Sequence, residues 1–150
     1  MTRNASKHVL VADPSGLLAR NLERNLKDSC QISVVKTGKE TILGLFNDKP
    51  DLLIIEEKLA DSNAIQVAQI LKQKKFSIPM LLLLQQQSTL DSNEIESHGF
   101  SDSFQRPFNI PNLVEKIKEV LSIEPYSRER EEKFSQLLND IEAKLAKHEN

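Results

Sequence analysis

The sequence predicts a doubly wound α/β domain, in which a five-stranded parallel sheet carries helices on both faces. Three short apolar runs, at residues 8–12, 52–55 and 80–84, are bounded by polar or helix-breaking residues, as buried strands are. Within each run, apolar residues follow one another and do not alternate with polar ones. This pattern indicates a strand that is buried on both faces and favours a parallel sheet. Helical periodicity fills the intervals, so that five strand–helix repeats are expected between residues 8 and 122.

The remaining elements follow from weaker patterns in the same order. Two further strands are predicted at residues 32–35 and 102–105. The first helix is expected to start at Pro14, because proline is favoured in a first helical turn and leucines then recur every four residues. The four other helices are predicted from apolar stripes, which lie within residues 42–46, 65–71, 88–97 and 111–121.

The composition indicates one soluble globular domain. Of the 150 residues, 39% are hydrophobic, and 20 basic residues against 22 acidic ones leave a net charge of −2. This balance disfavours both a disordered chain and a nucleic-acid-binding domain. The longest apolar run, Met80–Leu84, is far shorter than the ~20 residues of a membrane-spanning helix. Residues 1–7 lack the apolar core of a signal peptide, so we expect a cytoplasmic protein with a flexible N-terminal arm there.

Cysteine and histidine are too sparse to suggest a metal or redox centre. Cys30 is the only cysteine, which excludes an internal disulfide and a cysteine-based zinc site. The three histidines have no metal-ligand spacing, and the turn after the first predicted strand lacks a glycine-rich phosphate-binding pattern. We therefore expect no metal and no cofactor.

Four local strings occur in a characteristic order along the predicted fold. They are Val11-Ala12-Asp13-Pro14, Lys49 to Glu56, Ile78-Pro79 and Arg106-Pro107-Phe108. In this order and spacing they resemble the receiver domain of bacterial response regulators, over residues 8–122. The resemblance implies a flavodoxin-like receiver fold and a role in two-component signal transduction or a phosphorelay. It also implies, by analogy, a partner-binding face within residues 88–121.

A working receiver of this family transfers a phosphoryl group to an aspartate that ends the third strand. Two acidic residues after the first strand help to hold Mg²⁺, a hydroxyl after the fourth binds the phosphoryl group, and a lysine after the fifth neutralises it. A switch aromatic precedes the lysine by three residues. In this chain these positions hold, in sequence order, Ala12 and Asp13, Glu56, Leu84, Ser103 and Arg106. The comparison implies a retained fold, a degenerate acidic pocket and lost phosphorylation chemistry.

Glu56 and Arg106 replace the phosphoacceptor and the lysine, and both are expected to project into one pocket. Glu56 is one methylene longer than aspartate, and Arg106 has a fork of donors that matches a carboxylate. One hypothesis is a pair that mimics the phosphorylated state, and the other is an inert ion pair or two solvated charges. Asp13 is a helix cap, a partner of Arg106 or part of a residual cation site. Asp61 is a helix cap or a substitute phosphoacceptor.

The last segment, residues 127–149, has the pattern of a separate amphipathic helix. Phe134, Leu138, Ile141 and Leu145 follow a 4-3-4 spacing, which is the seam of a short coiled coil. This seam predicts a weak parallel homodimer through the last helix. A helix folded back on its own domain and a linker to a further domain are the alternatives.

These observations predict a phosphorylation-independent receiver that acts as a protein–protein interaction module in signalling and not as an enzyme. Its expected partners are signalling proteins. We expect it to bind neither nucleic acid nor a membrane. The first alternative is a phosphoacceptor receiver that uses Asp13 with Asp61 or Glu56. The second is a flavodoxin-like nucleotide- or flavin-binding domain, which is disfavoured because the chain has no Trp and a single Tyr for ring stacking.

Overall fold

Five parallel strands form the central sheet of the computed structural model, which describes residues 7–122 and 136–143. The spatial order of the strands is β2-β1-β3-β4-β5. The strands are β1 (Lys7–Ala12), β2 (Cys30–Val35), β3 (Leu52–Glu56), β4 (Met80–Leu84) and β5 (Asp102–Gln105). The order reverses between β1 and β3, so the switch point of a doubly wound sheet lies where these strands end.

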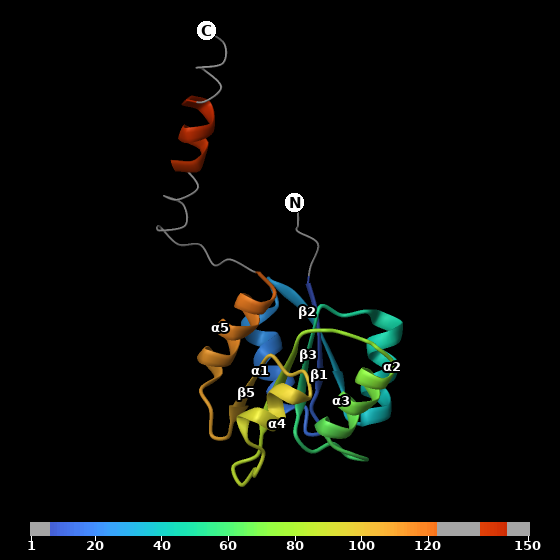
Figure 1. Cartoon of the computed structure of the whole chain (residues 1–150). Coiled ribbons are helices and arrows are strands. Elements are labelled where there is room, and N and C mark those ends of the chain that lie inside the picture. The colour runs from blue at the N-terminus through green and yellow to red at the C-terminus, as the bar shows by residue number, and fades with distance from the viewer. Residues whose placement is uncertain (1–6, 123–135, 144–150) are drawn as a thin grey trace.

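Helices cover both faces of this sheet (Figure 1). They are α1 (Leu17–Leu26), α2 (Gly38–Asp48), α3 (Ala64–Gln73), α4 (Ser92–Ser97) and α5 (Ile110–Val120). Apolar residues of α1 and α5 pack in one core, and those of α2, α3 and α4 pack in a second core on the opposite face. The predicted doubly wound fold with helices on both faces is confirmed.

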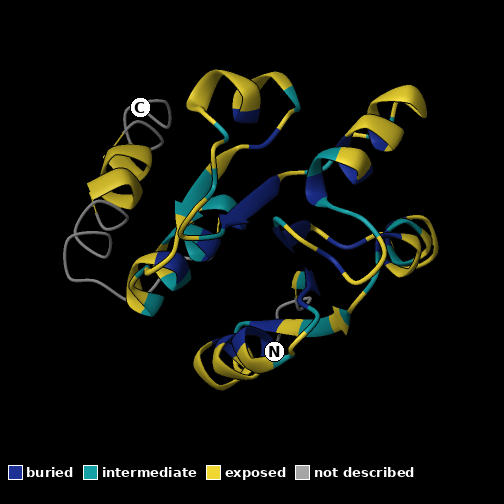
Figure 2. Ribbon diagram, turned by 90° about the horizontal axis from the view of Figure 1, so that it is seen from below, coloured by how far each residue is buried: buried dark blue, intermediate teal, exposed yellow. Residues whose placement is uncertain are grey.

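The strands β3 and β4 are buried along their whole length. Alternate residues enter opposite cores: Leu53 and Leu82 face α2 and α3, whereas Ile54 and Leu81 face α1 and α5. Figure 2 shows this burial along the strands and on the inward sides of the helices. The absence of hydrophobic alternation in these segments therefore has a direct structural cause.

Several elements have other boundaries than the sequence predicts, and β3 includes Glu56 in addition to residues 52–55. β1 starts at Lys7 and β2 at Cys30, because these two residues are already paired across the sheet. Lys7 therefore belongs to the sheet and not to the N-terminal arm, while residues 1–6 lie outside the described residues. α4 starts only at residue 92, because the Asp91 side chain accepts a hydrogen bond from the Glu94 N–H (2.8 Å) and caps the helix there.

The start of α1 also differs from its prediction at Pro14. Gly16 precedes the helix with a φ of 77°, a left-handed conformation that glycine adopts at little cost. Its N–H donates a hydrogen bond to the Asp13 carbonyl (3.1 Å), which closes a turn over residues 13–16. The helix begins after this turn, at Leu17.

Residues 136–143 form a helix in which all eight residues are exposed. Leu137, Leu138 and Ile141 are 55%, 44% and 45% exposed. Phe134 and Leu145, which complete the predicted seam, lie outside the described residues, so the coiled coil stays a prediction. Among the helices that are described, none combines the length and the apolar character needed to cross a membrane.

Candidate functional site

The candidate site lies at the edge of the sheet where the parallel strands end. Ala12, Glu56 and Leu84 are the last residues of β1, β3 and β4. Asp13 follows β1 directly, and Arg106 follows β5 directly. Because the strands run in the same direction, these positions share one edge, as the sequence predicts.

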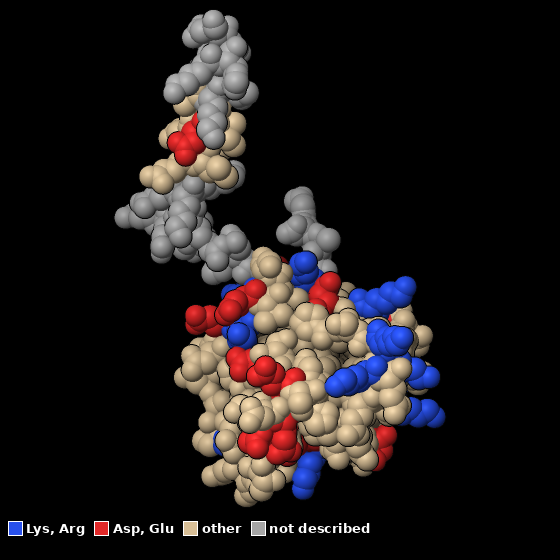
Figure 3. All heavy atoms as spheres, in the orientation of Figure 1, with Lys and Arg blue, Asp and Glu red and all other residues tan. Residues whose placement is uncertain are grey.

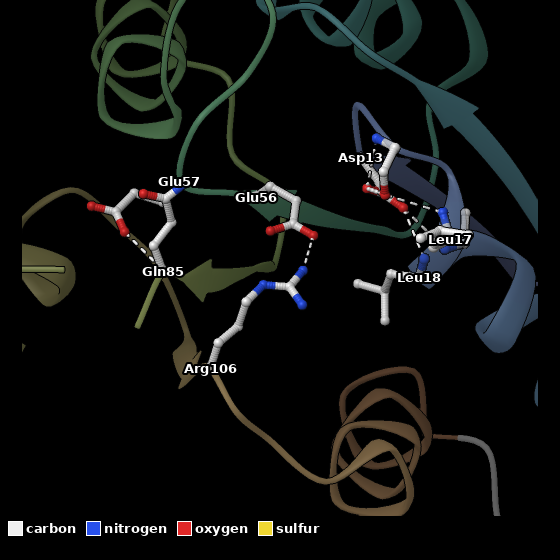
Figure 4. A network of polar contacts seen from close by, with 9 residues as sticks. Asp13, Leu17, Leu18, Glu56, Glu57, Gln85 and Arg106 are labelled. Carbon is white, nitrogen blue, oxygen red and sulfur yellow. Dashed lines mark hydrogen bonds and ion pairs between the residues drawn. The ribbon is translucent and has the colours of Figure 1, made fainter. Parts of the chain in front are cut away.

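Glu56 and Arg106 form an ion pair at this edge (Figure 4). Nη2 of Arg106 donates a hydrogen bond to Oε2 of Glu56. The Glu56 side chain is 11% exposed and that of Arg106 is 44% exposed, so a buried carboxylate meets a half-solvated cation. The guanidinium carbon also lies 5.2 Å from the ring centroid of Phe108, within the range of a cation–π contact. The predicted pairing of the two residues is confirmed.

Burial raises the pKa of Glu56 above its ordinary value. The positive charge of Arg106 lowers this pKa and the negative charge of Asp13 raises it, and the net direction is upward. The ion pair therefore offsets only part of the cost of removing the carboxylate from water.

Asp13 is buried and caps α1. Its Oδ2 accepts hydrogen bonds from the backbone N–H groups of Leu18 (3.0 Å) and Ala19 (3.2 Å). Its Oδ1 accepts the N–H and the hydroxyl of Ser15, at 3.3 and 3.1 Å. The positive end of the helix dipole also favours a carboxylate there. The helix-cap alternative is confirmed, and the alternative pairing with Arg106 is wrong because that guanidinium bonds elsewhere.

This edge does not suit the Mg²⁺ that the receiver resemblance implies. Mg²⁺ requires several oxygen ligands in octahedral geometry. Ala12 has no side-chain oxygen, both oxygens of Asp13 are engaged at α1, and Glu56 is neutralised by a guanidinium. Within residues 7–122 and 136–143, no three His, Cys, Asp or Glu side chains gather in a way that could hold a metal ion.

The positions of the hydroxyl and the switch aromatic supply neither group. The Leu84 side chain is 5% exposed and belongs to the core that contains α2 and α3. Ser103 is half-buried, and its backbone N–H donates a hydrogen bond to Oδ1 of Asp102 (2.8 Å). The end of β4 therefore places a methyl-bearing side chain where a receiver needs a hydroxyl.

Glu57 is a polar residue of this edge that the sequence analysis misses. Its carboxylate accepts hydrogen bonds from the Gln85 N–H (2.9 Å) and the Ser88 hydroxyl (3.0 Å), which ties the loop after β4 to the end of β3. Glu57 turns toward this loop, whereas Glu56 turns toward Arg106 (Figure 4), as alternation along an extended chain requires. The paired glutamates are visible in the sequence, but their partners are determined by tertiary structure.

Asp61 caps the N-terminus of α2. Its carboxylate accepts hydrogen bonds from the N–H groups of Gly38 (2.6 Å) and Lys39 (3.4 Å) and from the Ser62 hydroxyl (2.8 Å). The Gly38 N–H, foremost among these donors, lowers the pKa of Asp61 below its ordinary value. The helix-cap alternative is confirmed, although Asp61 caps α2 and the following helix α3 is capped by Asn63.

Solved receiver structures share this arrangement of strands and helices. A signal receiver domain from Vibrio parahaemolyticus aligns with a TM-score of 0.72 and 24% identity, over 79% of this chain and 92% of that one. A CheY-like response regulator receiver domain from Methanospirillum hungatei aligns with a TM-score of 0.70 and 19% identity, over 79% and 95% of the two chains. The chain has the fold of a response-regulator receiver domain.

Curated proteins with similar sequences support this receiver resemblance. The chain is 25% identical over 114 residues to the "Virulence transcriptional regulatory protein PhoP" of Salmonella choleraesuis, and equally to the "Transcriptional regulatory protein PhoP" of an Escherichia coli strain. Each match covers 75% of this chain and 51% of the regulator, so the chain spans about half the length of these relatives. No family model matches the chain.

A double-mutant cycle with Glu56→Gln and Arg106→Met tests the ion pair at this edge of the sheet. We expect a coupling free energy of about 1–2 kcal/mol, because one partner is buried and the other is half exposed. Urea unfolding at neutral pH measures this coupling. The control is the same cycle on Lys116 and Asp102, whose charged atoms are 3.5 Å apart at a more exposed site and should couple by at most ~1 kcal/mol. Zero coupling between Glu56 and Arg106 would contradict the described pair.

The raised pKa of Glu56 predicts a pH dependence of stability. The folded state binds the Glu56 proton more tightly than the unfolded state does, so this residue lowers the free energy of unfolding as pH rises through its titration range. Glu56→Gln removes this dependence. The unfolding free energy of the variant minus that of the wild type should therefore become more positive as pH increases from acid to neutral. Asp61→Asn should show the opposite slope, because the pKa of Asp61 is lowered. Equal slopes for the two variants would refute the assignment.

Proposed function

We propose that this receiver domain binds protein partners in a signalling pathway independently of phosphorylation. The observation that carries the proposal is the bond between Arg106 and Glu56, which occupy the positions of the lysine and the phosphoacceptor. The family resemblance implies that a receiver with a complete site needs a free carboxylate at the first of these positions and uses the cation at the second to bind the transferred phosphoryl group. Here the two charges are paired in the unmodified chain.

The surroundings of Glu56 oppose phosphoryl transfer. A nucleophilic carboxylate must be ionised and free to attack, and the phosphoryl charge must be neutralised during the transfer. Glu56 is bonded to a guanidinium, and Asp13 is engaged as a helix cap. Leu84 offers no hydroxyl to the product. We therefore propose that the domain is not an enzyme.

We propose one constant state of the domain in place of a switch. Glu56 supplies a negative charge beside the Arg106 cation without modification. In a complete receiver, a hydroxyl at the position of Leu84 and an aromatic ring at the position of Ser103 would report a change in this charge to the rest of the domain. Leu84 has no hydroxyl, and Ser103 has no aromatic ring. A fixed signalling surface fits this combination better than a regulated one.

The proposed partner surface comprises α4, β5 and α5, within residues 88–121. Its exposed charges near α4 are acidic: Asp91, Glu94, Glu96 and Asp102 are all exposed, and acidic side chains gather over α4 in Figure 3. The loop that leads into α4 is held by Glu57, whose carboxylate accepts a hydrogen bond from the Ser88 hydroxyl. A protein partner with a basic surface complements this face.

The PhoP relatives suggest bacterial two-component signalling as the setting of this domain. Their names describe transcriptional regulators, and the match covers about half of their length. We propose the signalling context for this chain and assign it no contact with DNA, because its composition has no basic excess.

The lack of phosphotransfer is testable with a small phosphodonor and Mg²⁺. We expect the intact mass of the protein, measured under conditions that preserve acyl phosphates, to stay unchanged because Glu56 is not a free nucleophile. A receiver domain with a complete site, treated in parallel, should gain one phosphoryl group and serves as the control. Addition of one phosphoryl group per chain would support the phosphoacceptor alternative. If Glu56→Gln then failed to add the group, Glu56 would be the phosphorylated residue.

The partner surface is testable by charge reversal. Glu94→Lys combined with Asp102→Lys should abolish capture of specific partners from a lysate of the source cell, because both exposed carboxylates belong to the acidic face. The control, Glu23→Lys, reverses an exposed charge on α1 and should leave capture intact. Quantitative mass spectrometry of the captured proteins measures the effect. Equal capture by all three proteins would place the partner site elsewhere.

A further inference from the structure

β2 is an edge strand, and its outer side has no pairing partner in the part of the chain that the structure describes. The strand order places β2 at one end of the sheet and β5 at the other. The carbonyl of Val35 accepts a hydrogen bond from the Asp13 N–H (2.9 Å), so the backbone of Val35 faces β1. Successive residues of a strand direct these groups to opposite sides. The N–H and C=O groups of Cys30, Ile32 and Val34 therefore point away from the sheet.

β2 also lacks the features that normally protect an edge strand from pairing. Protected edge strands are short, or they carry charged residues, proline or a bulge. β2 has six residues, none of them charged, proline or glycine, and its register with β1 runs without a bulge. Val34 is 44% exposed, which leaves this part of the edge accessible. The opposite edge differs, because β5 has four residues and begins with the exposed carboxylate of Asp102.

The edge of β2 is complementary to itself in the antiparallel direction. Pairing about Ile32 would place Ile32 opposite Ile32 of a second copy, and Cys30 opposite Val34. Residues that face each other in this way exchange both of their backbone hydrogen bonds, so every outward N–H and C=O group of the strand finds a partner. The side chains match as well, because apolar Cys30 meets apolar Val34 on one face of the sheet and polar Gln31 meets polar Ser33 on the other.

We propose that the β2 strands of two copies of this chain pair antiparallel about Ile32 and join the two five-stranded sheets into one continuous sheet. A second copy presents β2 as a strand that is already formed, so it avoids the ordering cost that an extended peptide pays on binding. A two-fold axis relates the copies and closes the contact at a dimer. β2 lies outside the acidic surface near α4 and outside the pair of Glu56 and Arg106. The contact is therefore independent of the proposed partner surface and of the phosphorylation chemistry.

Light scattering of the full chain over a concentration series tests the proposal. We expect a dimer with a dissociation constant on the order of micromolar, because an edge-to-edge contact is small. Val34→Lys should weaken the dimer by about tenfold or more, since a lysine on an edge strand opposes pairing. The matched control is Leu43→Lys, which makes the same change at a residue that is 51% exposed on α2. Urea unfolding verifies that both variants are folded.

Two outcomes of this experiment would contradict the proposal. One is a wild-type chain that stays monomeric well above micromolar concentration. The other is equal dimerisation of the wild type, Val34→Lys and Leu43→Lys, which would place the interface elsewhere, for example on the last helix.

NMR of the dimer identifies the paired groups and their direction. The Ile32 N–H should exchange with solvent about tenfold or more slowly in the wild-type dimer than in monomeric Val34→Lys. The Ser33 N–H faces β1 in both proteins and should exchange equally, which makes it the internal control. An intermolecular contact between the Hα atoms of Gln31 and Ser33 should mark the antiparallel register. Equal exchange of Ile32 in both proteins, or a dimer without this Hα contact, would overturn the proposal.

Discussion

Burial of β3 and β4 on both faces is the constraint on which the rest of this structure depends. A strand with apolar side chains on both faces needs a covering layer on each side, which the helices supply here. The same burial forces parallel connections through helices and brings the strand ends to one edge. It also means that a charged residue at the end of β3, Glu56, sits where water is scarce.

The polar groups at this edge are satisfied by one another rather than by a ligand. Glu56 bonds to Arg106, Asp13 bonds to the first turn of α1, and Glu57 bonds to the loop that follows β4. Each contact fastens the end of one strand to another part of the fold. A site that could hold a metal and a phosphoryl group would need some of these carboxylates to be free. The carboxylates of this edge therefore fasten parts of the fold to one another, and charged and apolar side chains are exposed on other surfaces of the domain.

Two such surfaces differ in chemistry. The acidic side chains near α4 suit a charged partner, whose association depends on long-range attraction and on salt. The outer sides of α2 and α3, in contrast, expose the apolar side chains of Leu43, Phe46 and Ile70.

The sequence by itself determined the order of the strands and helices, because uninterrupted apolar runs and helical stripes are local signals. It also placed Glu56 and Arg106 at one edge, since parallel strands with known order end together. Tertiary structure decided what local signals do not contain. The partners of Glu57 lie 28 and 31 residues further along the chain, and Asp61 caps a helix that precedes it by more than 20 residues. α1 begins at Leu17 and not at Pro14, because Gly16 closes a turn there and the Asp13 carboxylate caps the helix that follows. Such contacts depend on which groups the packed sheet brings within hydrogen-bonding distance, and a one-dimensional pattern does not encode that distance.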